Sequence, residues 1–217
     1  MVIIIITLIA PLLTILLYYD FNSILSSYQP YYLNVIKFSI FQAIISSIIS
    51  VCMGILFAHL LFKHSYIHGI NSLVNFLSFT FILPTIIIVL GIISIYGNSG
   101  YLNYILEFFD LNIYGILGII IAHVLLNFPF VTRIIFQSLQ DISHDEWSLA
   151  KHNGLEGFAL FKTIEWPAIK KTLPTILTMV FILCFMSFAP VIIFGGGPNF
   201  STLEISIYHA LLFEYDF

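Results

Sequence analysis

The second half of the chain contains one long polar stretch, DISHDEWSLAKHNGLEGFALFKTIEWPAIKK, residues 141–171. Ser143 followed by Glu146 is the capping-box pattern that begins a helix, because hydroxyl and carboxylate can each accept a backbone amide hydrogen bond. Asn153-Gly154 is typical of a helix end, since glycine adopts the left-handed conformation at little cost. The stretch therefore begins with a short helix that stops at Gly154.

A second short helix is expected after this glycine. Phe158, Phe161 and Ile164 recur every third residue, which gives the helix an apolar edge. Trp166-Pro167 is expected to end it, because the residue before a proline is pushed out of the helical region. A pair of apolar-edged helices in a polar stretch between two membrane spans is predicted to dock a partner protein.

The composition predicts an integral membrane protein. The 217 residues are 60% hydrophobic and 8% charged, and the mean hydropathy is +1.05, which no ordinary soluble domain reaches. The net charge of −4 provides no basic face for nucleic acid. Cys52 and Cys184 lie in apolar runs and are expected to be small hydrophobic residues of the spans, without a redox or metal role. No Cys, His or acid spacing indicates a metal site, and we expect no cofactor.

Five apolar runs are predicted to cross the membrane as helices, at residues 2–18, 38–62, 73–96, 114–136 and 172–194. Pro84 interrupts the third run, and Pro174 and Pro190 are expected to break the fifth. Ser201 with Glu204 repeats the capping-box pattern, so that a short helix is expected over residues 202–213.

The basic residues predict the orientation of these spans. If the five runs alternate, one side carries six of them, and only Lys37 falls opposite, at a span end where it can snorkel. This places the N-terminus and residues 141–171 in the cytoplasm. The six are Lys63, Arg133, Lys151, Lys162, Lys170 and Lys171.

The second run carries a ladder of small side chains, because Ser46, Ser50, Gly54 and Ala58 recur every fourth residue. Small residues on one face let a neighbouring membrane helix approach closely. His59 directly follows Ala58, so that it lies on the helix face next to this ladder.

Polar side chains within the spans are candidates for a permeation path. His123 and Asn127 share a helix face, and either line such a path or form an interhelical hydrogen bond. The break at Ser187-Phe188-Ala189-Pro190 either lines a substrate cavity or is a simple kink. The nearby aromatic rings of Phe185, Phe188 and Phe194 could attract a cationic ring-bearing solute.

Several observations argue against an enzyme. The apolar runs contain no Asp or Glu, which most intramembrane catalysts need. Residues 195–198 are glycine-rich but lack the Lys-Ser/Thr of a phosphate-binding loop, so that any ATP hydrolysis must occur on a separate chain. Glu156 and Glu165 are expected on a solvated face.

The polar stretch resembles the EAA loop of ABC-importer permeases. Ala150, Gly154 and Pro167 fall in the register of that motif, with Phe161, Ile164 and Trp166 at the matching places. Ser148 stands where the family has glutamate, and Leu149 where it has the first alanine. The resemblance implies that this loop couples to a cytoplasmic ATPase through Trp147, Ser148, Ala150, Gly154, Phe161, Trp166 and Pro167.

Residues 164–167, 183–189, 195–198 and 202–211 are similar to the thiamine (or thiamine pyrophosphate) permeases of this family. The implied protein is an all-α, multi-pass subunit of the bacterial inner membrane with the type I ABC permease fold. Its implied partners are an ABC ATPase, a second permease half and a periplasmic solute-binding protein. The candidate permeation path, which comes from the residues of the spans and not from the resemblance, comprises His123, Asn127, Ser187, Phe188 and Pro190.

Against that family, residues 1–217 are expected to form a single transmembrane domain, an incomplete N-terminal half that cannot transport alone. Two alternatives stay open. One is a related permease for another solute, such as ferric iron. The other is a non-transporting membrane scaffold whose residues 141–171 hold a cytoplasmic partner.

Overall fold

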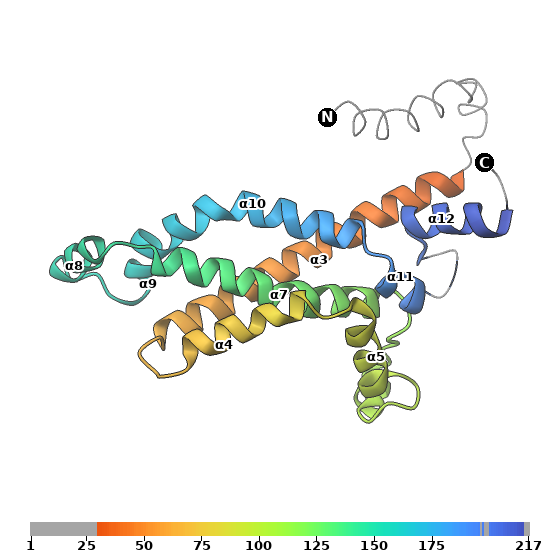
Figure 1. Cartoon of the computed structure of the whole chain (residues 1–217), viewed down its shortest axis with the longest axis horizontal. Helices are drawn as coiled ribbons and strands as arrows, with labels where there is room; N and C mark the ends of the chain where they lie inside the picture. Colours follow the sequence, from red (N-terminus) through yellow and green to blue (C-terminus); the bar gives the residue numbers. More distant parts are fainter. Residues whose placement is uncertain (1–29, 196, 198–199, 215–217) are drawn as a thin grey trace, which may run out of the picture.

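The computed structural model describes residues 30–195, 197 and 200–214 as an all-helical, elongated bundle. Its frame consists of three long helices, α3 (Pro30–Lys63), α7 (Ile116–Gln140) and α10 (Trp166–Phe185). Helix α3 packs along α7, and α10 contacts both (Figure 1). Helices α8 (His144–His152) and α9 (Gly157–Leu160) lie at one end of the molecule, and α11 (Ala189–Phe194) and α12 (Leu203–His209) lie at the other.

Three described helices are long and apolar enough to cross a membrane, and a bent helix pair could form a fourth span. The second and fourth predicted runs correspond to α3 and α7, and α3 begins eight residues earlier than predicted, at Pro30. Proline suits this first position because it has no amide hydrogen to leave unpaired. The predicted run at residues 2–18 lies outside the described residues.

The ladder of small residues forms the contact between α3 and α7. Ser46, Ser50 and Ala58 are fully buried. A Cβ atom at Gly54 would lie only 2.4 Å from Cγ1 of Val131. The prediction that this face admits a close neighbouring helix is therefore confirmed.

The third predicted run is broken at Pro84. Helix α4 (Ile70–Leu77) continues as the 3₁₀ turn η1 (Ser78–Phe81), and after a bend of 99° the chain resumes as α5 (Thr85–Tyr96). The hydroxyl of Thr80 donates a 2.6 Å hydrogen bond to the Leu77 carbonyl near this break. Helix α5 consequently turns away from the long axis of the bundle (Figure 1), and α6 (Asn103–Phe108) follows it.

The fifth predicted run is also two helices, since α10 ends at Phe185 and α11 begins at Ala189. Pro190 belongs to this break as predicted, but the prediction for Pro174 is wrong, because α10 continues through it. Pro174 lies exposed on the helix surface. A membrane helix tolerates proline where the freed carbonyl is not buried without a partner.

The predicted helix over residues 202–213 is α12 followed by the π-helical turn η4 (Ala210–Glu214). Its predicted capping box is wrong, because the N-cap is Thr202 and no side-chain cap hydrogen bond forms. The first helical amide, that of Leu203, donates instead to Ser39 Oγ of α3 at 2.9 Å. A side chain from another helix thus takes the place of the local cap.

The core has two parts. One lies where α3, α7 and α10 meet, and includes Val51, Ile135 and Val180. The other lies where α5, α7 and α11 meet, and includes Val89, Ile119 and Phe194. Between them, α7 carries the polar residues His123 and Asn127, both buried.

Candidate functional site

The first docking helix, α8, has both predicted end signals. The Glu146 amide donates to Ser143 Oγ at 3.2 Å. At the other end Gly154 has φ +68°, and the Leu155 amide reaches back to the Ala150 carbonyl at 3.0 Å. This is the six-to-one hydrogen bond of a Schellman motif, which a left-handed glycine allows.

The coupling residues predicted in α8 lie in different environments. Trp147 stacks on Phe62, near the end of α3, with ring centroids 5.8 Å apart, and Ala150 is buried. Ser148 stays within its own helix, with Oγ 3.4 Å from His144 Nδ1. Gly154 is exposed, and a Cβ there would have no atom within 4 Å, so that this glycine serves the turn and not a close contact between helices.

The second docking helix does not end at Trp166-Pro167, which corrects the prediction. Helix α9 passes through the π-helical turn η2 (Phe161–Glu165) directly into α10, and residues 157–185 form one continuous helix. Trp166 and Pro167 occupy the first turn of α10, where proline is tolerated because the wider π turn alters the hydrogen-bond pattern before it. Both side chains are exposed.

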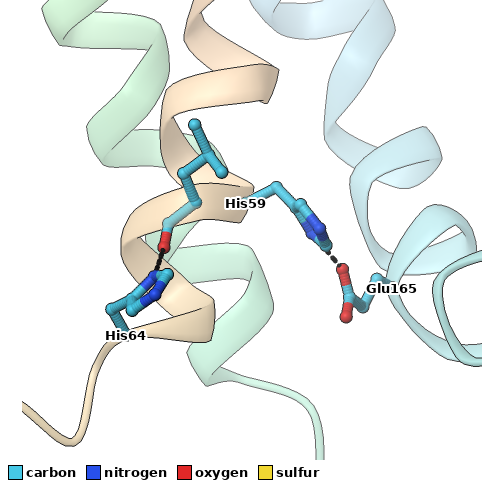
Figure 2. Close-up of polar contacts among 4 residues, drawn as sticks. His59, His64 and Glu165 are labelled. Atoms are coloured by element: carbon cyan, nitrogen blue, oxygen red, sulfur yellow. Dashed lines mark hydrogen bonds and ion pairs between the residues drawn. The ribbon is translucent and has the colours of Figure 1, made fainter. Parts of the chain in front are cut away.

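Glu165 lies buried at the head of α10, and not on a solvated face as expected. Its carboxylate Oε2 lies 2.6 Å from Nδ1 of His59 in α3, and the two side chains are 8% and 31% exposed. Figure 2 shows the two side chains pointing toward each other from separate helices. His59 also meets the ring of Phe161 edge-on, at 5.3 Å between centroids.

A cavity of about 420 Å³ opens where the two broken helices meet α7. The first break contributes Phe81, Leu83 and Thr85, and the second contributes residues 186–190. The α7 side contributes His123 and Asn127. The structure thus brings together all five residues of the predicted permeation path.

The cavity wall includes a buried polar network. His123 is 1% exposed, its Nδ1 lies 3.3 Å from Ser46 Oγ, and its Nε2, also buried, has no hydrogen-bond partner among the described residues. The Asn127 amide donates to the His123 carbonyl at 2.8 Å and approaches Cys184 Sγ at 3.5 Å. Gln42 Nε2 donates to the Cys184 carbonyl at 3.0 Å, close to the end of α10. Buried polar groups usually find partners, so that a buried Nε2 without one among the described residues is an exception in this wall.

Sequence reasoning missed Gln42 and Thr80 as neighbours of this site. Gln42 precedes Ser46 by four residues, so that a polar face on α3 was visible, but only the small residues were noted. Of the three phenylalanines singled out, Phe188 lines the cavity, whereas Phe194 is fully buried in the core and Phe185 packs against Phe181.

No group of His, Cys, Asp and Glu residues in the described part of the chain could hold a metal ion. The two cysteines are unpaired; Cys184 is buried among core residues, whereas Cys52 is exposed on α3.

Residues 50–215 match the family described as binding-protein-dependent transport system inner membrane component, and the chain belongs to that family. It is thus a multi-pass inner-membrane permease component of ABC transport systems, not the catalytic subunit. The match covers the docking helices, both helix breaks and the cavity residues of α7.

Among individual relatives, the chain is similar to the thiamine transport system permease protein ThiP of two bacteria. It is 38% identical to the Haemophilus influenzae protein and 36% identical to the Escherichia coli protein, each over 190 residues. These alignments cover 86% of this chain but only 35% of either relative, so that the chain spans about a third of their length. It is also 25% identical over 182 residues to a protein of Prototheca wickerhamii named a probable sulfate transport system permease protein, covering 83% of this chain and 71% of that one.

Proposed function

We propose that the chain forms part of the membrane subunit of an ATP-driven importer that carries thiamine or thiamine pyrophosphate across the bacterial inner membrane. The observation that supports this most directly is the convergence of both helix breaks, His123 and Asn127 on one cavity in a member of the permease family. Broken helices at membrane depth commonly line the substrate sites of transporters.

The chemistry of the cavity suits a cationic heteroaromatic solute. Its volume of about 420 Å³ falls within the range of roughly 300–1,000 Å³ found for small-molecule sites. Phe81 and Phe188 offer aromatic faces, and α10 ends beside the cavity with its carbonyl groups, the negative end of the helix dipole. His123 lines the cavity, and its buried Nε2, which has no partner among the described residues, would bond a polar group of the solute once the wall opens.

In this proposal the chain adopts the type I ABC permease arrangement and works with three partners. A second permease half completes the path, a periplasmic solute-binding protein delivers thiamine, and a cytoplasmic ATPase grips residues 141–171. The basic residues favour the cytoplasm for that loop and for the N-terminus. ATP binding and hydrolysis would then stabilise one arrangement of the helices over the other and so alternate access to the cavity.

The test is uptake of radiolabelled thiamine into vesicles that hold the assembled complex of these four proteins. Accumulation should require ATP, and excess unlabelled thiamine should abolish it. His123→Phe fills the cavity and removes the free nitrogen, and should lower uptake about tenfold or more, as expected for a lost hydrogen bond in a buried site. The matched control is Asn103→Ala, in the exposed Asn103–Glu107 pair of α6, which should leave uptake unchanged.

A second candidate function is transport of a different solute, which competition for uptake would reveal. One relative is named for sulfate transport, and ferric iron was the alternative expected from sequence. Uptake that sulfate or ferric iron suppresses, while thiamine and thiamine pyrophosphate do not, would reject the thiamine assignment and keep the permease one. Uptake unchanged by His123→Phe would reject the cavity as the path.

A further inference from the structure

The contact between His59 and Glu165 joins the docking segment, residues 141–171, to the long helix α3. The two residues are 106 positions apart in sequence, and Nδ1 and Oε2 are 2.6 Å apart. His59 belongs to the last turns of α3, and Glu165 is the last residue of the π-helical turn η2. This pair therefore bridges two elements that the chain itself does not connect directly.

The π-helical turn directs Glu165 inward. Its side chain lies on the same helix face as Ile169, Ile176 and Val180, which are buried in α10. A carboxylate at the head of an apolar stripe is costly to bury unless it is paired and hydrogen-bonded. His59 supplies the partner, so that the docking segment is most stable when Glu165 lies against α3.

Aromatic contacts place the same part of α3 against the docking segment. Phe62 stacks on Trp147 of α8, and the His59 ring meets Phe161 of η2. These rings and the His59–Glu165 contact surround a groove of about 660 Å³ that is open to the outside. The end of α3 thus contacts both docking helices, through ring contacts and through this hydrogen bond.

Helix α3 also reaches the cavity. Ser46 contacts His123, and Gln42 holds the Cys184 carbonyl near the end of α10. His59 follows Ser46 by thirteen positions, so that the contacts of these two residues lie about 20 Å apart along one uninterrupted helix. A displacement of Glu165 can therefore reach the cavity wall through a single rigid element.

We propose that His59 and Glu165 are positioning residues that couple the docking segment to α3, so that movement imposed on residues 141–171 by the ATPase is transmitted to the cavity. This inference rests on the proposed transport function. Neither residue touches the solute; both act by holding the docking segment at a fixed angle to α3.

The first measurement needs only the chain in detergent micelles. Its two tryptophans, Trp147 and Trp166, both lie in the docking segment, and a Trp166→Phe background leaves Trp147 as the single reporter. Acrylamide quenching of Trp147 then reports how far the segment leaves α3. Glu165→Gln and His59→Phe should each raise the undocked population about tenfold, the effect expected for one hydrogen bond to a charged group.

The second measurement separates positioning from folding. In vesicles that hold the assembled transporter, the two variants should keep ATP hydrolysis within about twofold of the parent, yet move roughly tenfold less thiamine per ATP. A merely structural role would lower hydrolysis and transport together. The exchange variant His59→Glu/Glu165→His restores a pair of the same chemistry and should recover most of the lost coupling.

The matched control is Glu107→Gln on the distant helix α6, which removes the charge of a carboxylate that accepts a 2.6 Å hydrogen bond from Asn103. It should change neither measurement. Two results for Glu165→Gln overturn the inference: acrylamide quenching of Trp147 equal to that of the parent, or an unchanged amount of thiamine moved per ATP hydrolysed. An equal effect of the control, or no recovery in the exchange variant, overturns it as well.

Should Glu165→Gln fail to fold, the same measurements on His59→Phe, which keeps a ring against Phe161, test the inference. A parent complex that accumulates no thiamine would reject the transport proposal, while the quenching data would still test the pair.

Discussion

Substituting Gly54 by alanine tests whether α3 and α7 touch through their backbones. A Cβ atom at Gly54 would lie 2.4 Å from Val131 Cγ1, 2.5 Å from Val131 Cβ and 3.2 Å from the Phe128 carbonyl oxygen. Because carbon atoms pack at about 3.5–4.0 Å, the helices must separate by about 1.1 Å or Val131 must move. Neither is easy, since Val131 is fully buried.

The expected cost follows from this overlap. Inserting a methyl group into a closely packed site costs about 1–3 kcal/mol, and Gly54→Ala should lower the free energy of unfolding by that amount. The matched control is Gly91→Ala in α5, where a new Cβ would meet no atom within 4 Å. There alanine should be neutral or stabilising by up to about 1 kcal/mol, because it favours a helix over glycine.

The assay is reversible unfolding in mixed detergent micelles, titrated with a denaturing detergent and followed by far-ultraviolet circular dichroism. The double variant Gly54→Ala/Val131→Ala removes Cγ1 but leaves the Cβ atom 2.5 Å away, so that it should recover only part of the loss. If Gly54→Ala proved as mild as Gly91→Ala, the close approach of α3 and α7 would be refuted.

Three other predictions concern single contacts. Gln42→Leu removes the donor to the buried Cys184 carbonyl and should cost about 1–3 kcal/mol of unfolding free energy, measured in the same titration; a neutral result would mean that another group satisfies this carbonyl. Ser39→Ala removes the acceptor for the Leu203 amide and should speed its hydrogen exchange about fivefold, as for a lost helix cap worth roughly 1 kcal/mol, whereas unchanged exchange would dismiss this cap. Gly154→Val forces a β-branched residue to φ +68° and should reduce co-purification of the ATPase, whereas Gly154→Asn should retain it; equal retention would separate this turn from docking.

Local signals in the sequence predicted local structure well. The cap at Ser143, the left-handed turn at Gly154 and the small ladder of α3 each depend on residues a few positions apart, and the structure contains all three. The interruptions at Pro84 and Pro190 were visible for the same reason, since proline lacks the amide hydrogen that continues a helix.

The same reasoning failed where distant residues decide the outcome. The π-helical turn η2 leaves no clear sequence signal, yet it joins the second docking helix to α10 and turns Glu165 toward His59. The capping pattern at Ser201 was overridden by Ser39 of another helix. Pattern and spacing describe one helix at a time, whereas these contacts depend on which helices become neighbours.

The cavity shows most clearly how local signals differ from contacts between distant residues. The sequence predicted two helix breaks and one polar helix face. It left open whether the break at residues 187–190 was a kink or a cavity wall, and whether the polar face lined a path or formed a hydrogen bond. Only the packing of α5 and α11 against α7 brings them to one place. Their convergence on one cavity is the observation on which the transport proposal rests, because unrelated kinks have no physical reason to meet at the same place.

The two breaks and the close contact between α3 and α7 also limit where this protein can move. Because Gly54 leaves no room for even a methyl group against Val131, α3 and α7 should rotate together as one body rather than slide past each other. The helix breaks at residues 82–84 and 186–188 lack continuous helical hydrogen bonds, and they are the places that can absorb a change of backbone angle. Both flank the cavity, so that a rotation imposed at the docking end would change the cavity walls first. Spin labels on α5 and α10 should therefore report a larger change in separation than labels on α3 and α7 when the ATPase binds ATP, and equal changes would contradict this division into a rigid pair and two hinges.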